Sequence, residues 1–417
     1  MTTRQNSRLL LTTMVVSLIV PFVAAVGLSA AEPLFEKATV FSAGDQGYRT
    51  YRIPGLVATK SGALLAYCEA RRTAGDWASI DVVLRRSEDG GKTWLPQRKI
   101  VDVDPKDVVQ NRPQGARRPE DSDDVTVNNP VAVVDRDSGD VHFLYCVEYG
   151  RCYYMRSTDD GKSFSPPVDI TPTFEGFRAD YDWKVLATGP GHGIQTASGR
   201  LIVPVWLSTG TGGGGHRPSA VSVIFSDDHG RTWRRGEIVV AHPHPINPSE
   251  TVAVELADGR VMLNIRHEGK TPDEALRHRA VVVSDDGATG WSKPRYDDAL
   301  PEPICMASIA RLTQQPHFAK NRIVFAQPHN PVDRTRKNVS VKLSYDEGQS
   351  WPVMRTIEPA GSGYSDLAVG PDKTIYCLYE DAGSASVFQP QQLTLARFNL
   401  AWLTDGKDEL RPSGGSR

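Results

Sequence analysis

Ser87-Glu88-Asp89-Gly90-Gly91-Lys92-Thr93-Trp94 is the first of five copies of one short pattern, Ser-x-Asp-x-Gly-x-Thr-Trp or a close variant of it. The other copies begin at Ser157, Ser226, Ser284 and Ser344. In the fourth copy the glycine comes one place early, at Gly287. From serine to serine the intervals are 70, 69, 58 and 60 residues. Each interval is long enough for about four short strands and their loops, which is the size of one β-propeller blade.

The pattern predicts a hairpin turn between two strands. An apolar, strand-like run precedes the copies, as at residues 80–86, 221–225 and 339–343, and another extended run follows. In such a turn the Asp accepts hydrogen bonds from backbone amides, the Gly supplies a positive φ, and the aromatic residue packs back between strands. At this spacing six blades fit into the 386 residues after residue 31 (417 − 31). The expected fold class is all-β, a six-bladed β-propeller.

The composition is that of a large, β-rich globular protein. Hydrophobic residues make up 39% of the chain and charged residues 24%, and 36 glycines and 29 prolines supply many turns. Long amphipathic helical stretches are nearly absent, which argues against a parallel α/β fold. With 48 basic and 50 acidic residues the net charge is −2, so the balance indicates neither nucleic acid nor an anionic membrane as a partner. An acidic ligand would need a local basic pocket.

Residues 1–31 have the pattern of a secretory signal peptide. Arg4 and Arg8 form a basic region, an apolar core runs from Leu9 to Leu28, and Ser29-Ala30-Ala31 supplies small residues for cleavage. We therefore expect an exported protein, secreted or periplasmic, whose propeller domain covers residues 32–417 and which has no stable membrane span after cleavage. A retained anchor stays open as the alternative, because the apolar stretch approaches the roughly 20 residues that span a bilayer.

The chain has five cysteines, an odd number for an oxidising compartment: Cys68, Cys146, Cys152, Cys305 and Cys377. At least one is expected to be unpaired, and a bridge between Cys146 and Cys152 stays open. Neither the cysteines nor the histidines have the spacing of metal ligands. No metal ion and no other cofactor is therefore expected.

The five copies resemble the Asp box, or BNR repeat, of the sialidase (neuraminidase) superfamily. That resemblance implies a six-bladed catalytic propeller. The box by itself marks only the fold, because it also occurs in propellers that hydrolyse nothing. Its aspartates are interpreted as turn residues far from any active site, since turn chemistry already explains them.

Three arginines resemble those that bind the sugar carboxylate in this superfamily. Tyr51-Arg52-Ile53-Pro54 resembles the motif of the first, which assigns that role to Arg52. Arg266 resembles the second, and Arg336, chosen over Arg334, resembles the third. Planar guanidinium groups form bidentate, charge-assisted hydrogen bonds to a carboxylate that lysine cannot reproduce.

The other site residues are assigned by neighbouring motifs of the same superfamily. Gly363-Tyr364-Ser365-Asp366-Leu367 resembles the motif of the nucleophilic tyrosine, here Tyr364. Ser249-Glu250-Thr251 resembles the strand that carries its glutamate partner, here Glu250. Glu380 resembles the glutamate that orients the first arginine.

Glu69 to Trp77 resembles the loop that carries the acid/base aspartate. Asp76 is the best match, with Asp81 as the fallback, and Arg71 in the same stretch is assigned to substrate binding. Residues 189–195 resemble another stretch of the superfamily and are interpreted as a loop at the rim of the sugar pocket.

The resemblance implies a retaining exo-α-sialidase that acts on sialylated glycans, glycoproteins or glycolipids through a covalent tyrosyl intermediate. The anomeric carbon of a sialic acid carries a carboxylate, which would repel a carboxylate nucleophile but not a neutral phenol. A phenol has a pKa of roughly 10, so Tyr364 needs a base, Glu250, while Asp76 acts first as acid and then as base. The alternative is a non-catalytic Asp-box propeller that binds glycans or proteins. A related acidic sugar, or transfer in place of hydrolysis, also stays open.

Overall fold

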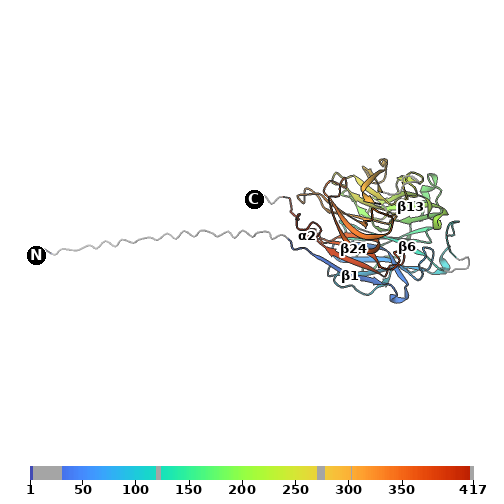
Figure 1. Ribbon diagram of the computed structural model, residues 1–417, viewed down its shortest axis with the longest axis horizontal. Coiled ribbons are helices and arrows are strands. Elements are labelled where there is room, and N and C mark those ends of the chain that lie inside the picture. The colour runs from blue at the N-terminus through green and yellow to red at the C-terminus, as the bar shows by residue number, and fades with distance from the viewer. Residues whose placement is uncertain (3–30, 119–123, 270–277, 302, 414–417) are drawn as a thin grey trace.

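The computed structural model of the chain describes residues 1–2, 31–118, 124–269, 278–301 and 303–413 (Figure 1). The expected signal peptide, residues 1–31, lies almost entirely outside these residues. Among the described residues, helix is confined to short segments: α1 (Thr171–Glu175), α2 (Leu400–Leu403) and the 3-10 turns η1 (Asp45–Gly47), η2 (Pro105–Asp107), η3 (Gly176–Ala179) and η4 (Gly213–Gly215). Within the described ranges, no helix has the length and apolar character needed to cross a membrane.

In the part of the chain that the structure describes, the strands form five sheets, in which chain neighbours pair antiparallel. The first contains β2 (Thr50–Ala58), β3 (Leu64–Arg71), β4 (Ile80–Ser87) and β5 (Arg98–Lys99). The second contains β6 (Val127–Val134), β7 (Val141–Val147), β8 (Arg151–Ser157), β9 (Val168–Asp169) and the short parallel β11 (Gly191–His192). The third contains β10 (Val185–Thr188), β12 (Ile194–Gln195), β13 (Leu201–Gly212), β14 (Arg217–Ser226), β15 (Arg234–Arg235) and β16 (Val240–Ala241). The fourth contains β17 (Thr251–Glu255), β18 (Val261–Ile265), β19 (His278–Ser284) and β20 (Arg295–Pro301).

The fifth sheet is larger than one blade. It contains β1 (Phe35–Ser42), β21 (Ser308–Thr313), β22 (Arg322–Pro328), β23 (Lys337–Ser344), β24 (Val353–Val369), β25 (Ile375–Gly383) and β26 (Gln392–Phe398). β24 is 17 residues long and pairs with β23 along its first part and with β25 along its second. The all-β, propeller-like fold is thus confirmed, but the strands form five sheets instead of six separate ones, because β24 runs on from one group of strands into the next.

The two ends of the folded chain meet in the fifth sheet. β1 pairs antiparallel with β26, from Phe35 opposite Phe398 to Ser42 opposite Gln392. Figure 1 shows β1 beside the red C-terminal strands. The first strand therefore closes the arrangement by hydrogen bonds to the last one, which leaves fewer unpaired strand edges.

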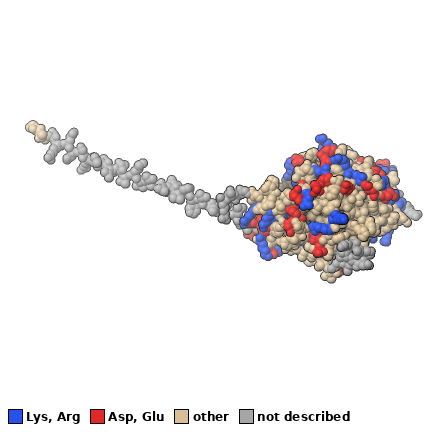
Figure 2. Space-filling model, turned by 90° about the horizontal axis from the view of Figure 1, so that it is seen from above, with Lys and Arg blue, Asp and Glu red and all other residues tan. Residues whose placement is uncertain are grey.

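Apolar side chains fill the spaces between neighbouring sheets. Every residue of β3 is buried, because that sheet is covered on both faces. Tyr67 of β3 packs edge-on against Phe143 of β7 in the next sheet, with ring centroids 5.1 Å apart. Outside the core, basic and acidic side chains are interspersed over the face in Figure 2, in keeping with the near-balance of charge.

The five cysteines belong to this core. All of them are buried, and no disulfide joins them in the described part of the chain. Cys146 and Cys152 stand directly opposite each other across β7 and β8 as thiols. The bridge that the sequence left open is absent.

The Asp-box turns have the predicted geometry. In the first copy, Asp89 accepts the Thr93 amide at 2.9 Å and the Thr93 hydroxyl at 2.6 Å, and Ser87 Oγ accepts the Gly91 amide at 2.9 Å. Gly91 has a φ of 84°, which favours glycine. The same carboxylate bonds recur at Asp159, Asp228 and Asp346. Ser87 pairs with Leu64, whereas Arg71 is at the other end of β3.

We expect Asp89→Ala to lower the melting temperature and to leave the activity of the folded protein unchanged, because the carboxylate holds only a turn. Bonds to Thr93 lower the pKa of Asp89 from 3.8 to about 2. Its contribution to stability is therefore present above the ordinary pKa and is lost as the pH falls towards about 2. Thermal unfolding of the wild type, Asp89→Ala and the exposed control Lys92→Ala across this range tests the effect. Loss of turnover at an unchanged melting temperature would contradict it.

Candidate active site

Tyr364, on the second part of β24, is the centre of a buried polar cluster that we call the Tyr364 cluster. Its members come from different sheets and their loops: Arg52, Glu250, Arg266, Arg336, Tyr364 and Glu380. The guanidinium carbons of Arg52 and Arg336 lie 5.2 Å from the centroid of the Tyr364 ring. The Arg266 guanidinium carbon lies 5.9 Å from the same centroid. The structure thus brings the three sequence-assigned arginines around the sequence-assigned tyrosine.

Glu380, on β25, fixes the first of these arginines. Its fully buried carboxylate accepts Arg52 Nε at 3.0 Å and Nη2 at 3.4 Å, and also the amides of Ile53 at 3.2 Å and Tyr364 at 3.1 Å. A side chain at Gly363 would collide with this carboxylate, because a Cβ there would lie 2.3 Å from Glu380 Oε2. The glycine before Tyr364 therefore permits the close approach of β24 to Glu380.

The backbone at Arg52 is irregular. The pairing of β2 with β3 shifts register between Arg52 and Gly55. Within this bulge Ile53 has a φ of 58°, which is costly for a β-branched residue. The bond from the Ile53 amide to Glu380 helps to hold the strained conformation, and the irregularity coincides with the arginine that the sequence singled out.

Glu250 and Arg266 meet at the Tyr364 hydroxyl. Glu250 lies just before β17 and Arg266 just after β18, which pairs with β17, so both side chains project from the same end of one sheet. Tyr364 donates its hydroxyl to Glu250 Oε1 at 2.5 Å, and Arg266 Nη1 donates to the tyrosine oxygen at 2.6 Å and also to Glu250 Oε2. Burial raises the pKa of Tyr364 far above its ordinary value, so the phenol is neutral.

The third arginine of the cluster is Arg336. It is buried and donates from Nη2 to the carbonyl oxygen of Ile304. Its Nη1 is buried without a hydrogen-bond partner among the described residues. Arg334, the alternative weighed from the sequence, is exposed. The geometry therefore places Arg336, and not Arg334, beside Tyr364.

Asp76 lies on the loop between β3 and β4, where Arg71 binds it. Arg71 Nη1 donates to Asp76 Oδ1 at 2.8 Å, and the Asp76 side chain is 48% exposed. Desolvation raises the pKa of Asp76. The positive charge of Arg71, with smaller contributions from His216 and Arg52, outweighs this effect, so the pKa of Asp76 stays well below its usual value. The carboxyl is therefore ionised at neutral pH.

Asp81, the fallback for the acid/base residue, has other contacts. It accepts the Tyr48 hydroxyl at 2.8 Å and lies 3.0 Å from Lys99 Nζ and 3.6 Å from Arg72 Nη2. Of the two aspartates, Asp76 is the one that forms a salt bridge with Arg71.

Glu69 is a residue that sequence reasoning missed. It is fully buried and accepts Arg71 Nε at 2.9 Å and Nη2 at 2.6 Å, as Glu380 does for Arg52. It also accepts the Asn129 amide at 2.8 Å. The sequence contained an indication of this pair, because Glu69 and Arg71 are two positions apart in a strand and so project from the same face of the sheet.

An aromatic wall beside Asp76 was also missed. Trp77 and Tyr149 have ring centroids 4.8 Å apart, and His216 lies 4.9 Å from Tyr149 and 5.3 Å from Trp206. Trp77 Nε1 donates to the carbonyl oxygen of Gly214 at 2.6 Å, which ties the Asp76 loop to the glycine-rich loop of residues 210–215. No short sequence motif links these four segments.

Residues 104–377 match the sequence model of the BNR repeat-like domain family. The chain is also similar to the sialidase of Micromonospora viridifaciens, with 31% identity over 399 residues that cover 89% of this chain and 55% of the relative. A sialidase of Bacteroides fragilis is 29% identical over 367 residues, which cover 84% of this chain and 63% of that protein. The chain belongs to the BNR repeat-like domain family, within the sialidase superfamily.

A solved structure gives the same result for the fold. A Hadza microbial sialidase superposes on this BNR repeat-like domain with a TM-score of 0.72 and 26% identity, over 88% of this chain and 69% of the other. The chain spans little more than half of the Micromonospora relative and under two thirds of the Bacteroides one.

Asp366, two residues after Tyr364, links several inner strands of the BNR repeat-like domain. Its carboxylate accepts His192 Nδ1 at 2.7 Å, the Ser308 hydroxyl at 2.9 Å and the Leu56 amide at 2.8 Å. These bonds join β24 to β2, β11 and β21, and so hold Tyr364 in place relative to Arg52.

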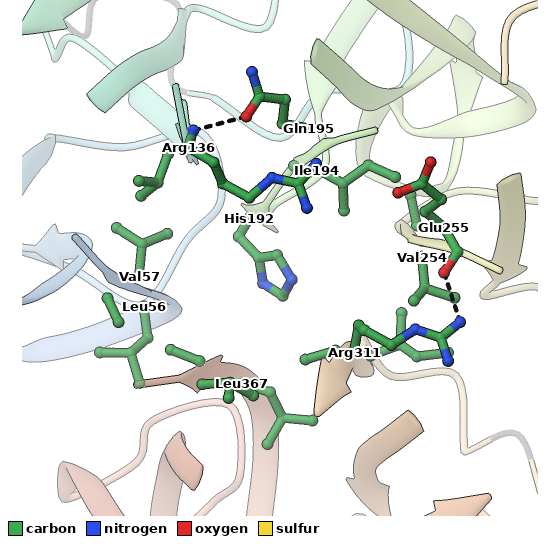
Figure 3. A pocket seen from close by; sticks show the side chains of 18 of the residues that line it. Leu56, Val57, Arg136, His192, Ile194, Gln195, Val254, Glu255, Arg311 and Leu367 are labelled. Atoms are coloured by element: carbon green, nitrogen blue, oxygen red, sulfur yellow. Dashed lines mark hydrogen bonds between the residues drawn. The ribbon is translucent and has the colours of Figure 1, made fainter. Parts of the chain in front are cut away.

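His192 also points into a cavity of about 230 Å³ (Figure 3). Arg136, Gln195, Glu255 and Arg311 line the cavity, and no member of the Tyr364 cluster does. Of residues 189–195, which were expected at the rim of the sugar pocket, residues 192–195 line this cavity. Gly191 faces the apolar neighbours of Tyr364, because a Cβ there would lie 2.5 Å from Met306 Cε, which packs in one cluster with Tyr364. The place of residues 189–195 at the rim of the sugar pocket therefore stays a prediction.

Proposed function

We propose that this chain is a retaining exo-α-sialidase that removes terminal sialic acids from glycans, glycoproteins or glycolipids. The observation that carries the proposal is the Tyr364 cluster, in which three arginines surround a tyrosine whose hydroxyl donates to Glu250 at 2.5 Å. Membership of the sialidase superfamily supports it. A protein that only bound glycans would have no need of a base on that hydroxyl.

The three arginines favour a substrate with a carboxylate. Arg52, Arg266 and Arg336 carry three positive charges against the two negative charges of Glu250 and Glu380, which gives the Tyr364 cluster a net positive charge. The buried Nη1 of Arg336, without a partner in the described part of the chain, is a donor that a substrate carboxylate would satisfy. Desolvated charge-assisted bonds of this kind give both affinity and orientation.

The covalent step needs Tyr364 to lose its proton as it attacks. The buried phenol is a poor nucleophile while neutral, and Glu250 is placed to accept the proton as the phenolic oxygen bonds to the anomeric carbon. Arg266 stabilises the charge that develops on the phenolic oxygen, and Glu250 returns the proton to this oxygen when water displaces it from the anomeric carbon. Asp76 donates a proton to the leaving oxygen, and afterwards takes one from the water that releases the sugar, so the anomeric configuration is retained.

This scheme requires a change at Asp76, which Arg71 keeps ionised in the ligand-free protein. An anionic substrate bound by the neighbouring arginines adds negative charge, which raises the pKa of a nearby carboxyl. We therefore expect net proton uptake when an unsaturated sialic acid analogue binds at about pH 5, measured by calorimetry in buffers of different ionisation enthalpy. Asp76→Asn should abolish the uptake and Asp81→Asn should retain it. The reverse result would assign the role to Asp81.

The fold and location complete the proposal. The seven-stranded sheet counts as two blades that share β24, which gives six blades in one domain over residues 32–417. The buried rings of Trp77, Tyr149 and Trp206 pack together with the half-buried ring of His216 and hold the Asp76 loop against the glycine-rich loop. Export through the N-terminal signal would bring the enzyme to glycans outside the cytoplasm, in a secreted or periplasmic location.

The test is hydrolysis of a fluorogenic α-sialoside by the purified protein. We expect release of the fluorophore from the α-sialoside and none from a neutral galactoside with the same fluorophore. Binding of sialylated glycans without release would instead support the non-catalytic propeller.

A further inference from the structure

We propose that Asp135, Asp137, His142 and His229 form a binding site for a divalent transition-metal ion of the Zn²⁺ type. The site lies between the second and third sheets, away from the Tyr364 cluster. Asp135 and Asp137 belong to the turn between β6 and β7, His142 to β7, and His229 to the third Asp box, between β14 and β15. The ion would be independent of the proposed hydrolysis.

The ligand atoms of three of the four residues already converge, and His142 lies beside them. One ligand atom each from Asp135, Asp137 and His229 lie within 4.8 Å of one another. Asp135 Oδ2 is 2.6 Å from His229 Nδ1 and 3.7 Å from His142 Nε2. Ligands at about 2.0–2.1 Å around a tetrahedral Zn²⁺ stand roughly 3.3 Å apart. To admit the ion, the hydrogen bond between Asp135 and His229 must open by less than about 1 Å, and His142 must move slightly closer to Asp135.

His142 gives the second, independent indication. Its side chain is fully buried, and its Nε2, aimed at Asp135, has no hydrogen-bond partner in the described ranges. A buried imidazole nitrogen left without a partner is costly. Its Nδ1 lies 2.8 Å from the Tyr154 hydroxyl. If Nδ1 donates to that oxygen, Nε2 presents a lone pair towards Asp135 Oδ2, and a cation between the two atoms removes the repulsion.

The neighbours hold the ligands in position, as outer partners do at metal sites. Asp135 Oδ1 accepts the Asp137 amide at 2.8 Å and Gln195 Nε2 at 3.0 Å, which leaves Oδ2 for the two imidazoles. Gly230 packs directly on His142, since a Cβ there would lie 2.6 Å from His142 Nδ1. The box turn that carries His229 is thereby seated on His142.

The donor set selects the class of ion. Two imidazoles with two carboxylates suit Zn²⁺ and its transition-metal neighbours, whereas Ca²⁺ and Mg²⁺ prefer oxygen ligands throughout. The Asp137 and His229 side chains reach solvent, so an ion has an entry path. Sequence spacing could not predict this group of ligands, because His229 is 94 positions from Asp135 in the chain.

The ion would clamp two sheets together far from the proposed chemistry. Asp135 lies six positions after Asn129, whose amide bonds to Glu69. Six positions along a strand correspond to roughly 20 Å. We therefore expect Zn²⁺ to raise the melting temperature by a few degrees, because a ligand that binds only the folded state stabilises it.

The experiment uses the chelator-treated full protein without a polyhistidine tag. Calorimetric titration with Zn²⁺ should give one ion per chain, and Co²⁺ should produce visible absorption bands, whereas Ca²⁺ and Mg²⁺ should leave the melting temperature unchanged. His229→Asn removes the exposed imidazole but tolerates the φ of 58° at that position. We expect it to weaken Zn²⁺ binding by at least about tenfold and to abolish the cobalt bands.

Asp135→Asn, which keeps an acceptor for the turn amides, should have the same effect, so the test does not depend on one variant. His317→Asn, at an exposed histidine elsewhere, should bind as the wild type does. Absence of Zn²⁺ binding, equal binding by His229→Asn, or equal binding of Ca²⁺ would each overturn the proposal and leave Asp135 and His229 as an ordinary ion pair.

Discussion

Tyr364→Phe should lower turnover of an α-sialoside on the order of 10³-fold or more, while the protein stays folded and binds ligand nearly as well. The ring still packs among Ile53, Cys305 and Met306, and only the hydroxyl is lost. That hydroxyl is the attacking atom in the proposed mechanism, and Glu250 would have no proton to accept. Steady-state kinetics should show the loss in kcat, with KM little changed.

Tyr379→Phe is the matched control for this variant. Tyr379 is equally buried, pairs across the ladder with Ser365, and donates its hydroxyl to Glu358 at 3.3 Å. Its loss should leave turnover close to that of the wild type. If Tyr364→Phe retained normal turnover, Tyr364 would not be the nucleophile.

Arg52→Lys should weaken binding of a carboxylate-bearing substrate by about 1.5–3 kcal/mol, which is roughly 10- to 150-fold. Lysine keeps the charge but has no planar fork, so it cannot reproduce the paired bonds of Arg52 to Glu380 or bond to a substrate carboxylate with two parallel N–H groups. The measurements are KM and the affinity for an unsaturated sialic acid analogue. A melting curve is needed alongside them, because Glu380 is fully buried and loses donors.

Arg49→Lys serves as the control for Arg52→Lys. Arg49 is exposed and donates from Nε to Gln389, outside the Tyr364 cluster. It should bind the analogue as tightly as the wild type. Equal affinity in Arg52→Lys would show that Arg52 is not part of the carboxylate site.

The sequence predicted the local features of the fold because the Asp box is a local device. Its turn bonds join residues that are two to four apart, such as Asp89 and Thr93, and so its spacing reports the hairpins directly. The number of separate sheets is not local. The number of sheets depends on whether β24 ends after its pairing with β23 or continues and pairs with β25. The sequence of β24 does not indicate which of the two occurs.

The site residues were predictable where a motif keeps them together. The positions of Arg52 and Tyr364 were read from short motifs, although 312 residues separate them (364 − 52). The residues that sequence reasoning missed form contacts between segments that are distant in the chain. Asp366 of β24 accepts hydrogen bonds from β2 and β21, and the Asn129 amide donates to Glu69, 60 positions away. Such contacts exist only once the sheets are assembled, as does the group around Asp135.

The most direct test of the proposed chemistry is to trap the covalent intermediate with a difluorinated sialic acid, which slows release of the glycosyl-enzyme. After digestion, mass spectrometry should locate the added sugar on the peptide that contains Tyr364, and Tyr364→Phe should remain unlabelled. An adduct on another residue would contradict the site assignment. The absence of any adduct, together with no hydrolysis of an α-sialoside, would contradict the proposal that this chain is a sialidase.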